Sequence, residues 1–285
     1  MLAFARWLMQ RPSYAVGATL LASLIPWLFW LGAAIAALVT LRKGAAAALP
    51  VILAAAIPAG WWWTQGDVVP LASVLLATLM GVVLRERMRW SEALLAGTLA
   101  CAAMIELGIF RPPGGTEAML AQLRQSSAEF DRMVTELGRT GYDTTLLADL
   151  VVSGVTGLVI LLLAVACLAI GRSWQAGLYN PGGFRREFHA LRLAPRELAL
   201  LAGLGAISML FGMAGFALVG WVPLLIAGVA LVHGIIGLKE MNGLWLGAFY
   251  LLLITTWPMI LIVLLSGLID SFANVRARLA RSNGQ

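Results

Sequence analysis

Residues 148–171 read ADLVVSGVTGLVILLLAVACLAIG and decide the fold. After Asp149 this stretch contains no charged residue and no proline, and its apolar residues are continuous rather than alternating. A helix that crosses the roughly 30 Å hydrocarbon core of a bilayer needs about 20 such residues. A strand of a membrane barrel would instead alternate apolar and polar residues, because one of its faces lines the lumen. The stretch therefore predicts a transmembrane α-helix.

Further apolar runs of the same kind are spread over the chain. Two of them, 14–41 and 244–274, are too long for one ordinary span, and each contains an internal proline, Pro26 or Pro258. Proline is favoured at the first position of a helix and disfavoured inside it, so we divide both runs there. The expected spans are 14–25, 26–41, 44–63, 68–84, 91–110, 148–171, 197–219, 221–238, 244–257 and 258–274.

The divided runs are short for a full crossing, so the first and last hairpins either cross the membrane or re-enter it from one side. The expected fold is an all-α, polytopic transmembrane helical bundle of eight to ten spans, with residues 1–285 in a single domain. The composition agrees, because 61% of the residues are hydrophobic and only 12% are charged. It excludes a soluble enzyme, a disordered chain and a secreted disulfide scaffold.

The basic residues indicate how the chain lies in the membrane. The formal net charge is +6, and the Lys and Arg residues lie in short loops between the apolar runs. With the N-terminus in the cytoplasm, all but four of the 20 basic residues lie on the cytoplasmic side, as the positive-inside rule requires. The four exceptions are Arg111, Arg124, Arg132 and Arg139. The charge therefore indicates membrane topology rather than a nucleic-acid partner.

Two hydrophilic segments interrupt the apolar runs. In the external segment, 111–147, apolar residues recur every three to four positions and predict an amphipathic helix. Such a helix lies on the membrane, covers a cavity, pairs with a partner or packs on its own bundle. The apolar residues that recur in segment 111–147 are Leu120, Leu123, Phe130, Val134 and Leu137. The second segment, 172–196, is the expected cytoplasmic loop.

The cytoplasmic loop has the most distinctive sequence of the chain. Its NPGG run predicts a turn, and Phe184, Phe188 and Leu191 then follow at the spacing of one helix face. Because the other positions are mostly basic, with Glu187 among them, this short helix either lies beside anionic lipid at the inner interface or binds a membrane or cytoplasmic protein partner. The residues expected in this contact are Asn180, Pro181, Gly182, Gly183, Phe184, Arg185, Arg186, His189 and Arg192.

Three residues within or near the spans are candidates for binding a ligand. His233 is ionisable at membrane depth, and it either serves a function or makes a hydrogen bond between helices. Glu106 lies near the outer end of its run and either faces an outward cavity or reaches the interface. Trp62, between two further tryptophans, belongs to an interfacial aromatic belt or to a ligand cage. Near the C-terminus, Asp270 is expected to cap a helix or to pair with Arg276.

The remaining inventory argues against catalysis. The chain has two histidines, and it contains none of the phosphate-loop, zinc-protease or nucleophile-elbow motifs. We therefore expect no catalytic residue, no metal and no cofactor, and no enzyme activity. Ala18 and Ala22 form a small-xxx-small pair that lets helices approach closely, within the bundle or against a partner subunit.

Four segments carry a resemblance to a known family. They are WLFWLGAAIAALVTLRKG (27–44), YNPGGFRREFHALRL (179–193), GVALVHGIIGLKE (228–240) and GLIDSFANVRAR (267–278). Together they resemble the YybS-like family of predicted bacterial inner-membrane proteins, which has no assigned activity. That family is distantly similar to the substrate-binding S-components of energy-coupling-factor vitamin transporters.

The resemblance implies a bacterial inner-membrane protein whose helical bundle has an outward-facing ligand cavity. Ala18 and Ala22 would match the alanine motif with which S-components contact their transmembrane partner. The chain departs from S-components in having more than six expected spans and no vitamin-site motif. These observations favour binding or transport of a small molecule. The alternative is a membrane scaffold or assembly factor that acts through the NPGGFR loop.

Overall fold

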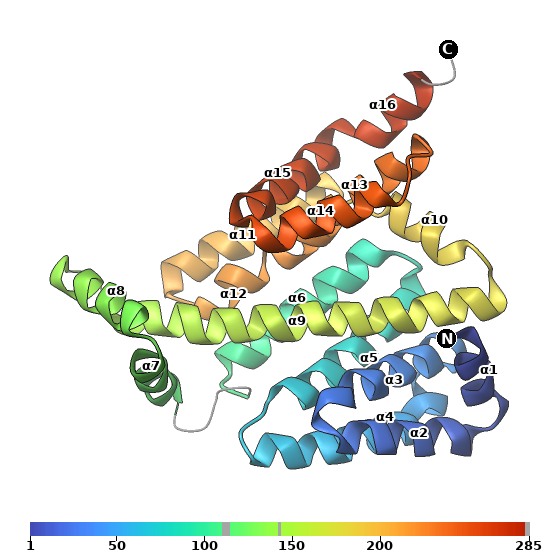
Figure 1. Ribbon diagram of the computed structural model, residues 1–285, viewed down its shortest axis with the longest axis horizontal. Coiled ribbons are helices and arrows are strands. Elements are labelled where there is room, and N and C mark those ends of the chain that lie inside the picture. Colours follow the sequence, from blue (N-terminus) through green and yellow to red (C-terminus); the bar gives the residue numbers. More distant parts are fainter. Residues whose placement is uncertain (110–114, 142–143, 283–285) are drawn as a thin grey trace.

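The computed structural model describes residues 1–109, 115–141 and 144–282, and this part of the chain is helical without a β-strand (Figure 1). The prediction of an all-α polytopic helical bundle is thereby confirmed. In chain order the elements are α1 (Leu2–Gln10), α2 (Pro12–Leu24), η1 (Pro26–Leu28), α3 (Phe29–Lys43), α4 (Ala45–Thr64), α5 (Val69–Arg87), α6 (Trp90–Glu106), α7 (Gly115–Ser126), α8 (Ala128–Arg139), α9 (Thr144–Tyr179), α10 (Gly183–Ala190), α11 (Pro195–Phe211), α12 (Ala214–Val219), α13 (Val222–Leu238), α14 (Leu244–Thr255), α15 (Trp257–Ala273) and α16 (Val275–Ser282).

Fewer helices are long and apolar enough to span a membrane than the sequence suggested. Within the described residues, four helices are long and apolar enough to cross a membrane, and six are if each of two bent helix pairs counts as one span. The expectation of eight to ten crossings exceeds this count because several apolar runs form short helices. One of these, α3, has 15 residues and is therefore about 22 Å long. The helices break at Pro26 and Pro258, where we divided the runs.

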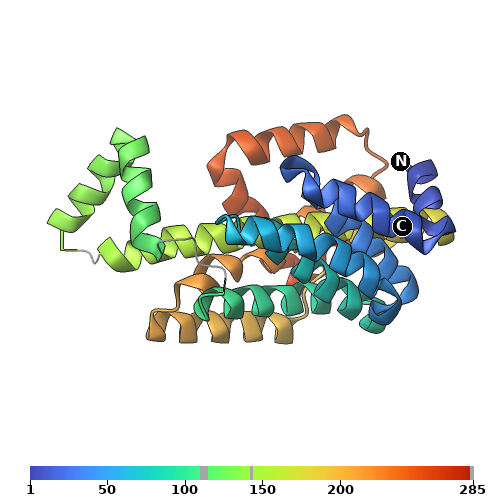
Figure 2. The same ribbon diagram turned by 90° about the horizontal axis from the view of Figure 1, so that it is seen from below.

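Helix α9 forms the long axis of the molecule (Figures 1 and 2). It has 36 residues and a length of about 54 Å. It continues to Tyr179, so the first third of the expected loop 172–196 is helical instead. Arginine favours the helical conformation, and residues 172–179 contain no proline, so nothing in this stretch ends the helix. The chain leaves the helical conformation only at the Asn-Pro-Gly turn that follows.

Helix α3 is the centre of the bundle and is enclosed by α2, α4, α5 and α9. All ten residues from Gly32 to Leu41 are buried. Six of them are glycine, alanine or threonine, whose small side chains let the surrounding helices come close. At Gly171 of α9 the backbone of α3 comes close, and an added Cβ would lie 2.9 Å from the carbonyl oxygen of Ala34.

The external segment contains two helices rather than one, since α7 and α8 are separated at Ser127. The Ser127 hydroxyl accepts a hydrogen bond from the backbone N–H of Phe130 and so caps α8. Arg124 and Asp131 form an ion pair of 2.6 Å across the break. Both helices lie at one end of α9 (Figures 1 and 2), where Val134 is buried. Residues 110–114 and 142–143 of this segment lie outside the described residues.

Candidate functional site

The predicted turn of the cytoplasmic loop is present and leads directly into α10. The backbone N–H of Gly183 donates to the carbonyl oxygen of Asn180 over 2.8 Å, and Asn180 also accepts a hydrogen bond from Arg186 through its side-chain oxygen. Gly182 has a φ of 77°, a left-handed conformation that favours glycine. The NPGG run thus turns the chain back from the end of α9, so that α10 lies against α13.

Residues 180–194 connect α9 to α11 and are called the linker below. Two polar anchors hold this linker to the bundle. At its start, Arg172 of α9 forms an ion pair with Glu187 of α10, and its Nε donates over 2.9 Å. At its end, Glu197 of α11 accepts hydrogen bonds from the Ser91 hydroxyl over 2.9 Å and from the backbone N–H of Ala194 over 2.6 Å. Arg172 and Glu197 are both buried. Because charge-assisted bonds between buried groups are strong, α10 is a fixed part of the fold.

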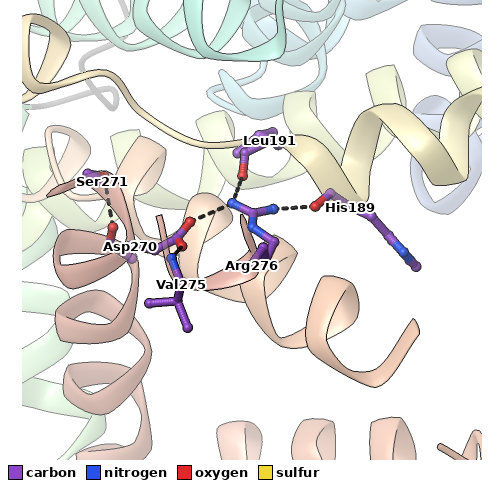
Figure 3. A network of polar contacts seen from close by, with 7 residues as sticks. His189, Leu191, Asp270, Ser271, Val275 and Arg276 are labelled. Atoms are coloured by element: carbon purple, nitrogen blue, oxygen red, sulfur yellow. Dashed lines mark hydrogen bonds and ion pairs between the residues drawn. The ribbon is translucent and has the colours of Figure 1, made fainter. Parts of the chain in front are cut away.

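A third anchor, Arg276 at the start of α16, holds the middle of the linker (Figure 3). It donates hydrogen bonds to the backbone oxygens of His189 and Leu191, the second over 2.6 Å. The same guanidinium forms a buried ion pair of 2.6 Å with Asp270 of α15. Asp270 also accepts a hydrogen bond from the backbone N–H of Val275 over 2.8 Å. The prediction that Asp270 caps a helix or pairs with Arg276 is confirmed, and it does both.

A row of aromatic rings connects the linker to three other helices. The ring of Phe184 lies 5.9 Å from Trp90 of α6 and 5.7 Å from Phe188. Phe188 meets the ring of His233 edge to face at 5.4 Å. The Nε2 atom of His233 then lies 2.9 Å from the hydroxyl of Tyr250 on α14. The apolar face of α10 is therefore packed inside this protein, and His233 makes a hydrogen bond between two helices.

A basic pocket of about 610 Å³ opens between α10, α13 and α16. The other residues that line it are small or uncharged, and no acidic residue is among the described residues of its lining. The carboxylates of Asp270 and Glu187, next to this lining, are each paired with a guanidinium, of Arg276 and of Arg172 respectively. The side chains that give the pocket its basic character are Arg185, Arg186, His189, Arg192 and Arg276.

Two glycines of α13 let the basic side chains come close to that helix. An added Cβ at Gly237 would lie 2.6 Å from Cε1 of His189, and one at Gly234 would lie 2.9 Å from Cδ of Arg276. The two positions are three residues apart and share one face of the helix. Any larger residue at either position would displace a side chain that lines the pocket.

The surrounding charges also set the protonation of the pocket. Burial lowers the pKa of His189 below its ordinary value, and the neighbouring side chains of Arg185, His233 and Arg276 lower it further. His189 is therefore a neutral imidazole near pH 7. The arginines keep their charge at any physiological pH. The pocket is thus positive, and an anion is the complementary ligand.

Glu106 and Trp62 do not join this cluster. Glu106 is the last residue of α6. The preceding residue, Ile105, packs against Gly157 of α9, and so does Val219 of α12. His233 follows Val219 by fourteen residues, which is about 20 Å along a helix. Trp62 is half-buried in the last turn of α4 and does not line the pocket. The structure therefore separates these two candidates from His233.

Ala18 and Ala22 lie elsewhere, on α2. Ala22 is buried and Ala18 is half-buried. Both line an apolar groove of about 460 Å³ that runs from Phe4 and Trp7 on α1 to Leu28 of η1. Small residues at this position shape the groove and let α2 pack closely against α3 and α4.

Comparison of the chain with protein-family models, with curated protein sequences and with solved structures found no match in any of the three. The chemistry of the pocket is therefore inferred from its own residues. Sequence reasoning assigned Arg185, Arg186, His189 and Arg192 to a contact surface, but it did not include Arg276 or the two α13 glycines. The spacing of the glycines in HGIIG, next to an ionisable residue, was the local signal for them.

Proposed function

We propose that this multi-pass membrane protein binds an anionic ligand in the basic pocket, from the cytoplasmic side. The observation that carries the proposal is the lining itself, in which four arginines and one histidine converge without a carboxylate among the described lining residues. Convergent polar groups in a concave site are typical of ligand binding. The proposal retains small-molecule binding or transport as the function, and it moves the binding site from the outer to the inner face.

The distribution of the basic helices supports the orientation in this proposal. Helices α1, α10 and α16 lie at the end of the molecule opposite α7 and α8 (Figures 1 and 2). Arg6, Lys43 and Arg87 belong to helix segments that are expected to lie on this side. The positive-inside rule then supports a cytoplasmic N-terminus. The resemblance to YybS-like proteins supports the inner membrane of a bacterium as the location.

Native mass spectrometry of the protein, extracted from its own membranes, tests this function. We expect a reproducible anionic adduct that is lost in the double variant Arg185→Gln, Arg192→Gln. The matched control is Arg278→Gln, because Arg278 is an exposed arginine of α16 that does not line the pocket. Equal occupancy of the adduct in the double variant and in the control would contradict the proposal.

A scaffold function remains the second candidate, and one observation favours it. The turn at Asn180, Pro181 and Gly182 is exposed, although the linker that carries it is held at three places. A fixed, exposed turn presents a constant surface to a partner, so it needs little ordering on binding. If the turn docks a protein, replacing residues 180–182 by Gly-Ser-Gly removes a stably co-purifying subunit. An unchanged set of co-purifying proteins would count against this function.

A further inference from the structure

We infer that the ligand of the basic pocket carries a phosphate group, which is bound as a dianion by Arg185, Arg186 and Arg192. This inference rests on the proposed function and makes it more specific. It follows from the number of unpaired guanidinium groups, from the shape of the anion that they match, and from the place of the pocket in the bundle.

The arginines that line the pocket differ in whether a carboxylate compensates their charge. Arg276 forms an ion pair with Asp270 and donates to two backbone oxygens, so it stabilises the fold and its charge is already compensated. Arg186 donates to the neutral amide oxygen of Asn180, which leaves its charge uncompensated. Among the described residues, neither Arg185 nor Arg192 has an acidic partner. The pocket therefore offers three uncompensated positive charges, more than one carboxylate neutralises.

The geometry of the guanidinium donors selects among anions. A guanidinium presents a planar fork of N–H groups that pairs with two oxygens of one anion. A carboxylate offers two oxygens that lie in one plane. A phosphate monoester has three terminal oxygens and accepts hydrogen bonds from several arginines at once. A lining with three free arginines therefore matches a phosphate better than it matches a carboxylate.

Contacts with the rest of the fold hold the segments that carry these arginines. Arg185 and Arg186 are neighbours on α10, which Glu187 fixes to α9. Arg192 follows directly after Leu191, whose carbonyl oxygen accepts a hydrogen bond from Arg276. The backbones of these arginines are thus positioned before any ligand arrives. Such preorganisation lowers the entropic cost of binding.

The place of the pocket leaves two sources for the phosphate. The pocket is lined by Gly234, Gly237 and Leu238, the last turn of an apolar helix that is long enough, together with α12, to cross a membrane. Basic pockets between helices at the cytoplasmic interface bind the headgroups of anionic lipids. The pocket is also open, so a phosphate free in solution has access to it. Both sources share the chemistry of the proposal, and the experiment separates them.

Thermal unfolding of the purified protein in a neutral detergent provides the test. The probes are inorganic phosphate, succinate, dihexanoyl phosphatidic acid and dihexanoyl phosphatidylcholine, added at equal ionic strength near pH 8. Phosphate and succinate are both dianions there, so they differ in shape rather than in charge. We expect phosphate or phosphatidic acid to raise the unfolding midpoint, because a ligand that binds the native state stabilises it. Succinate and phosphatidylcholine should leave the midpoint where it is.

The variants assign this effect to the pocket. The double variant Arg185→Gln, Arg192→Gln should lose the stabilisation, and Arg278→Gln should keep it. If the double variant yields too little folded protein, Arg185→Gln alone serves, because Arg185 is exposed and we expect its replacement to leave the fold intact. A shift with phosphatidic acid but not with phosphate identifies a lipid headgroup, and equal shifts identify a soluble phosphate.

Other outcomes overturn the inference in distinguishable ways. A shift with succinate that equals the shift with phosphate, and that disappears in the double variant, contradicts the phosphate assignment but keeps anion binding. A shift with phosphate that persists in the double variant shows that the anion binds elsewhere. If no probe shifts the midpoint and no anionic adduct is found by mass spectrometry, the proposed function fails as well.

Discussion

Helices α3 and α14 are both apolar, yet the fold uses them in opposite ways. In α3, ten consecutive residues are buried, whereas in α14 only Phe249 is buried. The buried part of α3, GAAIAALVTL (32–41), and the sequence of α14, LWLGAFYLLLIT, are both uncharged, and they differ chiefly in side-chain size. In lipid, hydrophobicity does not select the interior, since the surroundings are equally apolar. Small side chains therefore mark the helix that other helices enclose, and large ones mark the helix that faces outward.

The same contrast extends to the regions around the two helices. The region around α3 is held by close packing, and its buried side chains form one large hydrophobic cluster with those of α9. The apolar cluster near α14 has only three buried members, namely Val229, Phe249 and Val263. Instead, an ion pair of Arg276 with Asp270 joins α16 to α15 in this C-terminal region, and the same guanidinium donates to the backbone oxygens of His189 and Leu191 in the linker. We therefore expect the two regions to respond to different kinds of substitution.

The largest effect is expected when the buried ion pair is broken. Asp270→Asn preserves the shape of the side chain but leaves the Arg276 guanidinium buried without its counter-charge. Removing one partner of a buried pair costs about 3–5 kcal/mol. Chemical or thermal unfolding in detergent measures this loss of stability.

The external hairpin offers the matched control for this variant. Arg124 and Asp131 form a pair at the same distance of 2.6 Å, but their side chains are 41% and 46% exposed. Asp131→Asn should therefore cost no more than about 1 kcal/mol. If both variants lose equal stability, the C-terminal region is not held by charge, and the comparison of the two regions is wrong.

The next effect tests close packing at α3. Gly171→Ala places a Cβ 2.9 Å from the backbone nitrogen of Leu38 and from the carbonyl oxygen of Ala34, which are atoms of a helix rather than of a flexible side chain. We expect a loss of about 1–3 kcal/mol in the free energy of unfolding, the usual cost of overpacking. The control is Gly247→Ala on α14, where an added Cβ meets nothing within 4 Å.

In the control, the higher helix propensity of alanine should leave stability unchanged or raise it by up to about 1 kcal/mol. Equal destabilisation by the two substitutions would mean that α14 is enclosed as tightly as α3. That result would remove the distinction between an enclosed and an outward-facing helix. The same unfolding assay measures both variants.

The fold class was predictable from the sequence because it depends on local properties. Continuous apolar runs predict helices, and Pro26 and Pro258 mark breaks because proline lacks an N–H donor. The extension of α9 to Tyr179 was missed because we ended the span where the apolar run ends, at Gly171, although no proline follows before Pro181. The separation of α7 from α8 was missed as well, although Ser127 is a favourable N-cap residue.

The candidate site was predictable only in part, for the same physical reason. The local pattern of α10 indicated a basic face with Arg185 and His189. It did not indicate that Gly237 and Arg276, which are far away in the sequence, line the same pocket. Close approach between distant segments depends on tertiary packing. Similarly, nothing local distinguished His233 from Glu106, and only the fold separated them.

The smallest effect concerns the protonation of His189, and it sharpens the view that charge governs this region. A dianion in the pocket offsets the positive groups that lower the pKa of His189, so binding should raise that pKa. Affinity is then constant at high pH and rises as the pH falls through the range between the two pKa values. We expect a gain of up to about tenfold, since one pKa unit corresponds to a factor of ten. Sulfate is the suitable probe, because its charge stays constant between about pH 7 and about pH 5.5, where histidine titrates.

Isothermal titration with sulfate across this range measures the effect, and two variants assign it. The ionisable groups that lower the pKa of His189 are Arg185, His233 and Arg276, and His233 is the other imidazole among them. His189→Asn should therefore abolish the pH dependence, whereas His233→Asn should preserve it. A dependence that survives in His189→Asn would move the proton uptake to His233. In that case the interhelical bond to Tyr250, rather than the linker, would couple the pocket to pH, and α14 would respond to the ligand despite its sparse packing.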